Sequence, residues 1–223
     1  MDIRKALRFL LSVPKTLYFN FLVLDFKEAV RLPFFISYDI RIKYQKKDSK
    51  VCITSDTLHR FMIKIGAIGS EEISTKRSLI NLEKGTLEFK GYCSIAKGCT
   101  IGVSNGGHLI FGNRFSANRN FVISCNSDIT FGEDVLLGWN TFFFDANGHK
   151  ITIDGVESNP YSPIHIGNHV WICSEVHFLK GSEIPDGCVV AYGTLVSKKF
   201  NRCNSLIGGS VSQEIKNNVK WEK

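Results

Sequence analysis

The sequence lacks the cysteine spacing that would indicate a redox motif or a zinc site. Its cysteines are seven in number, and no two of them are separated by two residues. An odd set without such pairs predicts small, reduced and mostly buried side chains. The seven are Cys52, Cys93, Cys99, Cys125, Cys173, Cys188 and Cys203.

The sequence also lacks an apolar run of the length that a secretory core or a membrane span needs. Pro14 and Lys15 interrupt the apolar patch that starts at Leu7. We therefore expect a cytoplasmic protein. Residues 3–32 still mix basic and aromatic side chains, a mixture compatible with peripheral docking on the inner face of a membrane. Helices that pack on the main body are the other explanation for this segment.

Nucleic-acid motifs are absent too. The chain of 223 residues has a formal net charge of +7, which favours anionic partners such as phosphate-bearing cofactors or acidic glycans. It contains neither a zinc-finger spacing nor an RNA-recognition aromatic signature, and its basic residues are scattered, so we expect no nucleic-acid partner. With 43% hydrophobic residues the chain can bury a sizeable core in one globular domain.

What the sequence does contain is a repeat of six residues. An apolar residue recurs at every sixth position over one segment: Ile166, Ile172, Phe178, Ile184, Val190 and Val196. The residue two positions before each of these is small or β-branched, as close stacking of short strands requires. Shorter runs recur upstream, often with glycine directly after the apolar residue. A period of six fits neither a helix nor simple strand alternation.

These six-residue units, called hexads here, predict a three-sided coil in which each hexad supplies one strand and one corner. Such coils satisfy their backbone hydrogen bonds only by stacking. The sequence predicts an N-terminal helical or extended segment over 1–38, a β-helix over 39–200 and a C-terminal tail over 201–223. Between Phe143 and Ile166 the period gains five residues beyond one whole coil, which predicts a loop excursion near 144–163 where catalysis can take place.

Three local motifs resemble the hexapeptide-repeat acyltransferases, in the branch of the maltose, galactoside and capsular-polysaccharide O-acetyltransferases. The resemblance covers roughly residues 80–200. It is carried by the segment Phe111–Asn120 that ends in Ala117-Asn118-Arg119-Asn120, by the Gly148-His149 step, and by Ile164–Ile172 with its Ile-Gly-x-x-Val-Trp-Ile pattern. Near the C-terminus Gly208–Gln213 departs from the family's Gly-x-Pro-Ala-Lys. The resemblance implies a left-handed parallel β-helix that works as a homotrimer.

The resemblance further implies transfer of acetyl from acetyl-CoA to a sugar hydroxyl in capsule or O-antigen synthesis. Such a transfer needs a base near neutral pKa, and the resemblance assigns this role to His149. Asp145 either orients the histidine ring or forms hydrogen bonds within the loop. Asn120 either positions the acceptor or is a turn residue at a corner. Coenzyme A is assigned to seven positions: Trp171, Ala191, Tyr192, Gly193, Thr194, Lys198 and Lys199.

Three alternatives stay open at this point. An amino-sugar N-acetyltransferase would use the same coil, and a non-catalytic glycan-binding scaffold would fit the altered C-terminal motif. The coil also carries zinc carbonic anhydrases, which place two histidines five residues apart, whereas His165 and His169 are four apart. We therefore expect no metal. Outward aromatics around Trp139 and Phe142 suggest a subunit interface.

Overall fold

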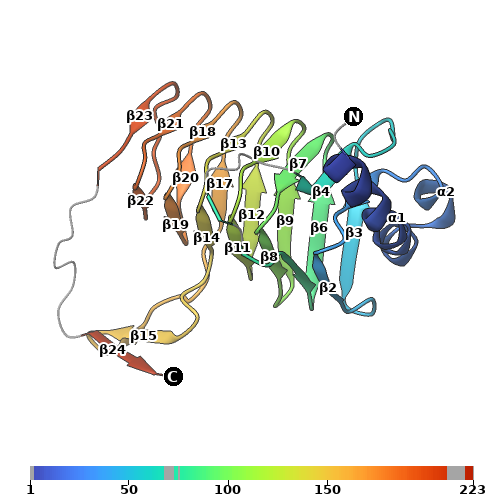
Figure 1. Cartoon of the computed structure of the whole chain (residues 1–223). Helices are drawn as coiled ribbons and strands as arrows, with labels where there is room; N and C mark the ends of the chain where they lie inside the picture. The colour runs from blue at the N-terminus through green and yellow to red at the C-terminus, as the bar shows by residue number, and fades with distance from the viewer. Residues whose placement is uncertain (1–2, 68–72, 75, 210–218, 223) are drawn as a thin grey trace.

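The computed structural model describes residues 3–67, 73–74, 76–209 and 219–222. The backbone winds into a coil whose three flat sides are parallel sheets (Figure 1). Successive strands enter the three sheets in turn, and each strand pairs with the strands of the coils before and after it. The predicted all-β solenoid, a left-handed parallel β-helix preceded by a short helical segment, is confirmed.

The strands are distributed over sheets A, B and C. Sheet A contains β1 (Phe34–Ile36), β4 (Ile63–Ala67), β7 (Cys93–Ala96), β10 (Phe115–Ala117), β13 (Leu136–Leu137), β18 (Trp171–Ile172), β21 (Val189–Val190) and β23 (Leu206–Ile207). Sheet B contains β2 (Arg41–Tyr44), β5 (Leu79–Leu82), β8 (Thr100–Val103), β11 (Val122–Cys125), β14 (Phe142–Phe144), β19 (His177–Leu179) and β22 (Leu195–Val196). Sheet C contains β3 (Ser49–Ile53), β6 (Gly85–Phe89), β9 (Gly107–Phe111), β12 (Asp128–Phe131), β17 (Ile164–Ile166) and β20 (Glu183–Ile184). The stacked strands thus extend beyond both ends of the expected range 39–200.

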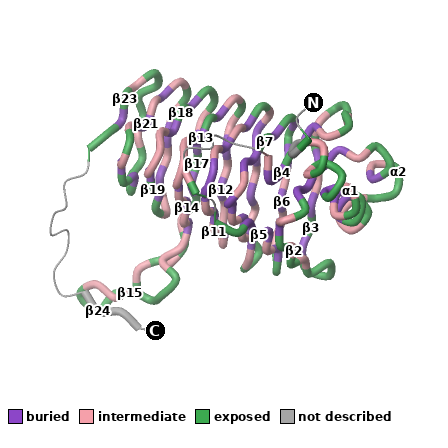
Figure 2. Tube along the Cα trace, in the orientation of Figure 1, coloured by how far each residue is buried: buried purple, intermediate pink, exposed green. Residues whose placement is uncertain are grey.

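The hexads form the core of the coil. All six repeating residues from Ile166 to Val196 are buried, and so are the six residues that lie two positions before them. Figure 2 shows buried positions recurring along every coil. Aromatic rings stack from coil to coil inside: Phe111 lies 5.4 Å from Phe89 and 5.5 Å from Phe131 between ring centroids. Such a column combines large buried area with favourable ring geometry.

The glycines that follow apolar residues have a steric cause. Gly112, Gly132 and Gly167 lie at the corner between sheets C and A, where adjacent coils approach closely. A Cβ atom on Gly112 would lie 2.1 Å from the carbonyl oxygen of Gly132, and one on Gly132 would lie 2.7 Å from that of Gly167. No side chain fits at that distance, so the repeat requires glycine there.

The N-terminal segment forms α1 (Ile3–Val23) and α2 (Phe26–Ala29), which cover the first coil (Figure 1). Polar residues at every fourth position of α1 face the coil: Arg8 donates to the Gly66 carbonyl of β4, whereas Ser12, Thr16 and Asn20 accept N–H groups of β1 and of Tyr38 just after it. The Asn20 amide donates to the Phe34 carbonyl (2.9 Å), and its oxygen accepts the Phe34 N–H (3.1 Å). The Thr16 hydroxyl accepts the Ile36 N–H at 3.0 Å. The helix therefore satisfies backbone groups that an edge strand would leave unpaired.

The predicted excursion leaves the coil after β14 and returns at β17. Residues 145–163, called the excursion here, carry the antiparallel strands β15 (Lys150–Ile153) and β16 (Val156–Glu157). The C-terminal strand β24 (Val219–Glu222) pairs with β15 and completes a small sheet beside the coil (Figure 1). Ser210–Gln213, the part of the altered C-terminal motif after its glycines, lies outside the described residues.

Candidate active site

The excursion and the corner between sheets B and C enclose a large groove. Its volume is about 880 Å³. The polar side chains that line it supply a histidine, a carboxylate, two ammonium groups and neutral hydrogen-bonding groups: Ser124, Asn126, Asn147, His149, Lys150, Glu157, Tyr161, Lys180 and Ser197. A groove of this size with a few convergent polar groups is the usual form of a small-molecule site.

His149 enters this groove because of the turn that precedes β15. Gly148 has a φ of 77°, in the left-handed region that favours glycine, and a Cβ atom there would meet nothing within 4 Å. Backbone conformation, and not crowding, therefore calls for glycine at this position. The turn directs the chain into β15 and leaves the histidine at the wall of the groove.

Asp145 holds the base of the excursion to the coil below. The residue is fully buried, and its carboxylate accepts the backbone N–H groups of Asn126 and Ser127, each at 2.8 Å. Hydrogen bonds to a charged acceptor in a buried place are among the stronger ones. The carboxylate thus forms its hydrogen bonds with the coil below and not within the loop, and orientation of His149 stays a prediction.

Sequence reasoning missed several residues of the groove. Asn126 lies where the hexad period gains two residues between Ile123 and Phe131, so the irregular spacing was its signal. Tyr161 lies in the excursion, whose length was noted but not its contacts. Lys180 donates to the Asn159 carbonyl, and burial lowers the pKa of its ammonium group. No sequence pattern distinguished this lysine from other surface lysines.

A second group of predicted residues lies across sheet B, at the corner between sheets A and B. Asn120 adopts a φ of 62° at that corner and is buried. Its amide oxygen accepts the Lys76 N–H (3.0 Å), and its nitrogen donates to the Ser74 carbonyl (2.8 Å). The turn role that we left open for Asn120 is thus observed. Asn120 lines a separate hollow of about 500 Å³ together with Phe142.

The predicted coenzyme A residues lie in three places: on sheet A, at the corner between sheets A and B, and at the corner between sheets B and C. Trp171 is half-exposed on sheet A, and the four residues from Ala191 to Thr194 form a turn at the corner between A and B. Tyr192 projects there with 72% of its surface exposed. Lys198 and Lys199 follow β22 at the corner with His149, where Lys199 pairs with Glu183 at 3.1 Å. Ser197, which precedes them in the sequence, lines the groove of His149.

The outer face of sheet B separates these two corners and is aromatic. Phe142 and Phe144 stack with ring centroids 6.3 Å apart, and the His177 ring lies 4.6 Å from Phe142. Leu179 and Leu195 extend this apolar surface into the following coils, with 39% and 54% of their surface exposed. The two groups of predicted residues therefore flank an apolar face and do not meet within one chain.

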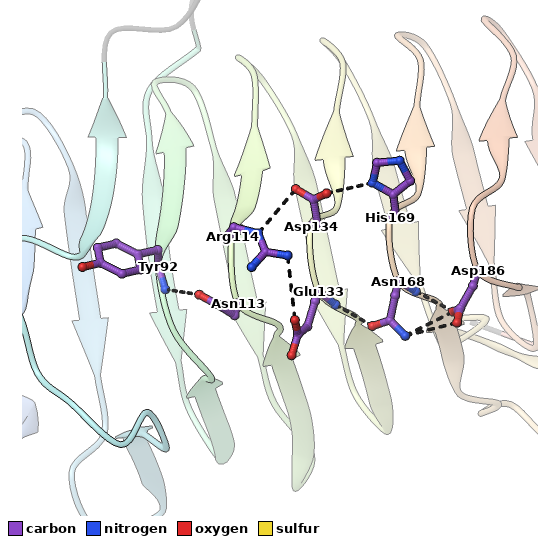
Figure 3. A network of polar contacts seen from close by, with 8 residues as sticks. All are labelled: Tyr92, Asn113, Arg114, Glu133, Asp134, Asn168, His169 and Asp186. Carbon is purple, nitrogen blue, oxygen red and sulfur yellow. Dashed lines mark hydrogen bonds and ion pairs between the residues drawn. The ribbon is translucent and has the colours of Figure 1, made fainter.

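The histidines that a zinc site would need lie on different sides of the coil. His165 is on sheet C, His177 is on sheet B, and His169 is at the corner between C and A. His169 binds Asp134 at 2.7 Å in a polar network that also includes Arg114 (Figure 3). Within the described ranges no group of three or more histidine, cysteine, aspartate or glutamate residues could hold a metal ion.

The coil is a left-handed parallel β-helix built from six-residue repeats. No family model matches the chain. Galactoside O-acetyltransferase of Escherichia coli strain K12 is 35% identical over 97 residues, which cover 43% of this chain and 47% of that protein. The chain spans about half the length of the curated relatives it matches. The predicted resemblance to the hexapeptide-repeat acyltransferases, including the galactoside branch, is confirmed.

Two solved structures are distantly similar to the chain. One is a hexapeptide-repeat acetyltransferase of Vibrio cholerae in complex with acetyl coenzyme A, at 21% identity and a TM-score of 0.41, covering 65% of this chain and 69% of that one. The other is the polySia-specific acetyltransferase NeuO, at 19% identity and a TM-score of 0.44, covering 85% of this chain and 75% of that one. These values describe distant similarity of architecture.

Proposed function

We propose that the chain is an acetyltransferase that moves acetyl from acetyl-CoA to a sugar hydroxyl, with His149 as the general base. The observation that carries this proposal is the position of His149, which lines the large groove of a coil whose curated relatives are acetyltransferases. The relative from Escherichia coli is named for O-acetylation of galactosides, which supports a sugar hydroxyl as the acceptor.

Two side chains of the groove, His149 and Lys180, suit this reaction. The imidazole of His149 takes the proton of the acceptor hydroxyl while the oxygen attacks the thioester carbonyl. When the carbon–sulfur bond breaks, the imidazolium returns the proton to the departing thiolate, so coenzyme A leaves as a free thiol. Asn120 would position the acceptor or polarise the thioester carbonyl. Lys180, whose ammonium group lies at the groove, can meet a phosphate of coenzyme A.

A complete site would require more than one copy of the chain. His149 and Asn120 line different hollows on opposite sides of the apolar face of sheet B. If this face packs against a second copy, the corner between A and B of one copy can approach the corner between B and C of the next. Three copies close such a head-to-tail contact into a ring. We therefore propose a homotrimer with Trp171, Tyr192 and Asn120 completing the groove of a neighbour.

We assign the reaction to the synthesis of capsule or O-antigen polysaccharide, in the cytoplasm and at the inner face of the membrane. All seven cysteines are free thiols and four of them are buried, which fits a reducing compartment. The net charge of +7 fits both coenzyme A and an acidic glycan as partners.

The test is turnover of acetyl-CoA, followed as thiol release with a panel of sugars, amino sugars, nucleotide sugars and oligosaccharides. His149→Ala is compared with the native protein and with His165→Ala, an exposed histidine on sheet C that serves as the matched control. We expect His149→Ala to lose about two to four orders of magnitude, the range for a general base, and the control to keep its rate. Acceptance of amino sugars alone would indicate N-acetylation.

Equal rates for the native protein and His149→Ala would show that the base is another residue. Thermal unfolding with acetyl-CoA tests the donor separately, because a ligand that binds only the folded state stabilises it by about 2.7 kcal/mol at a hundredfold excess over its Kd. Absence of both turnover and stabilisation would support the glycan-binding scaffold instead.

A further inference from the structure

The helix α1 is amphipathic, but its polar face contacts the protein and its apolar face is exposed, the reverse of an ordinary surface helix. Its polar residues, spaced by four, face the protein and bind the coil. Among the α1 side chains that the structure describes, every exposed one is apolar or aromatic: Ile3, Leu7, Phe9, Leu10, Leu11, Pro14, Leu17, Tyr18 and Phe21. Leu10 is 65% exposed and Phe21 is 47% exposed. A surface helix normally turns such a stripe toward the core.

This outer face of α1 continues into exposed residues beyond the helix. Phe26, at the start of α2, is 74% exposed and its ring lies 6.1 Å from that of Phe21. The exposed apolar residues therefore continue from α1 onto α2. Both helices lie at the N-terminal end of the coil (Figure 1). A continuous apolar surface of this kind marks an interaction site on a soluble protein.

Basic residues concentrate on the same end of the molecule. The first coil carries five of them over residues 41–50, with Asp48 as the single acidic residue: Arg41, Lys43, Lys46, Lys47 and Lys50. All five are exposed. A hollow of about 490 Å³ joins this basic coil to the helix, and Lys15, Arg41 and Arg77 line it beside Tyr18 and Tyr38. Cations next to aromatic rings at the border of an apolar stripe suit a phospholipid headgroup.

We infer that the N-terminal end of the coil docks on an anionic phospholipid bilayer. The outer face of α1 lies in the boundary between headgroups and acyl chains, and the basic first coil meets lipid phosphates. No helix within the described residues is long and apolar enough to cross a membrane. A second copy of the chain is the poorer partner, because two identical basic ends would repel each other.

This inference rests on the membrane location in the proposed function and adds to it the surface that docks and the class of lipid that it binds. It involves none of the groove residues. The helices lie at the N-terminal end of the coil, several coils away from the excursion (Figure 1). Docking through α1 therefore leaves the groove of His149 open to its substrates while it holds the enzyme close to the membrane.

The experiment is flotation of the full chain with vesicles of phosphatidylcholine alone and of phosphatidylcholine mixed with phosphatidylglycerol. The native protein is expected to float with the anionic vesicles and to release them as salt is raised. The double variant Leu7→Ser with Leu10→Ser should lose at least about tenfold in partitioning, because two leucine side chains no longer enter the interface. Leu206→Ser, an exposed leucine on β23 at the other end of the coil, is the control.

A second variant separates charge from apolar contact. Lys46→Glu with Lys47→Glu should weaken binding to anionic vesicles, with little effect on the already weak binding to phosphatidylcholine alone. Thermal unfolding and acetyl-CoA turnover with a soluble acceptor verify that each variant is folded. These readouts are independent, so absence of turnover would count against the proposed activity and not against docking.

The inference is overturned if the native protein floats with neither vesicle, or if the double leucine variant floats as well as the native protein. It is also overturned if that variant halves the mass measured in solution without lipid, since the outer face of α1 would then contact a second copy.

Discussion

Replacement of Asp145 by asparagine separates a structural role from a catalytic one. The carboxylate accepts two backbone N–H groups, from Asn126 and Ser127, at 2.8 Å each. An asparagine of the same shape keeps one acceptor oxygen and turns an NH₂ group toward the other N–H. One hydrogen bond to a charged, buried acceptor is then lost, at a cost of about 2–3 kcal/mol. For a chain of this size that cost lowers Tm by about 4–12 °C.

The assay combines thermal unfolding followed by circular dichroism with kcat/KM for the acetyl transfer. Asp154→Asn is the control, because Asp154 is an exposed residue of the same excursion. We expect Asp145→Asn to lower Tm within the stated range and to reduce kcat/KM by no more than about tenfold. An unchanged Tm with a loss of about a thousandfold or more in kcat/KM would refute this reasoning, because the carboxylate would then act on the imidazole ring.

Two further predictions concern the coil and its thiols. Gly112→Ala should destabilise the fold by about 3 kcal/mol or more, because its Cβ atom would lie 2.1 Å from the Gly132 oxygen. Gly102→Ala should cost much less, because its Cβ atom meets only the Ile123 oxygen, at 3.3 Å. Denaturant unfolding compares the two variants, and equal midpoints would contradict the steric account. Dithiobis-nitrobenzoate should label Cys203 rapidly and Cys99 only after unfolding, because Cys203 is exposed whereas burial raises the pKa of the Cys99 thiol to about 12 and keeps it protonated. Rapid labelling of Cys99 would show that the coil opens. Cys203→Ser should lower the background of the thiol-release assay.

Much of the fold could be predicted because the hexad repeat is a property of neighbouring residues. Each coil meets only the coils next to it, so the spacing of Ile166, Ile172 and Phe178 already specifies which positions face the core. The apolar-then-glycine pattern was visible as well, although its cause at Gly112 is the approach of the next coil's backbone. The first coil was harder to delimit because the turns before Leu79 vary in length.

The candidate site could be predicted only in part. Local motifs brought attention to His149 and Asn120, but no local pattern states which corner of a coil a residue occupies. The structure places these two residues on either side of sheet B, and only that separation suggests a site between copies. Lys180 and Asn126 join the groove because the excursion folds beside them, a contact between distant parts of the chain.

Which face of α1 contacts the coil could not be predicted either, although the four-residue spacing of Ser12, Thr16 and Asn20 is visible in the sequence. Polar residues with that spacing would usually mark the solvent side of a helix. Here they bind an unpaired strand edge, so the expectation for a surface helix is reversed by the backbone groups of β1.

The excursion leaves and rejoins the coil through a narrow neck. The Ser162 N–H donates to the Asp145 carbonyl at 3.0 Å, and Ala146 pairs with Tyr161 just outside. Above the neck, β17 sits on β12 in register, with Ile164 opposite Ile129, as though no residues had been inserted. The residues beyond the neck can therefore change in length and sequence without displacing a strand of the three coil sheets. The acceptor preference of the proposed enzyme can then be redesigned in this loop while the coil is kept.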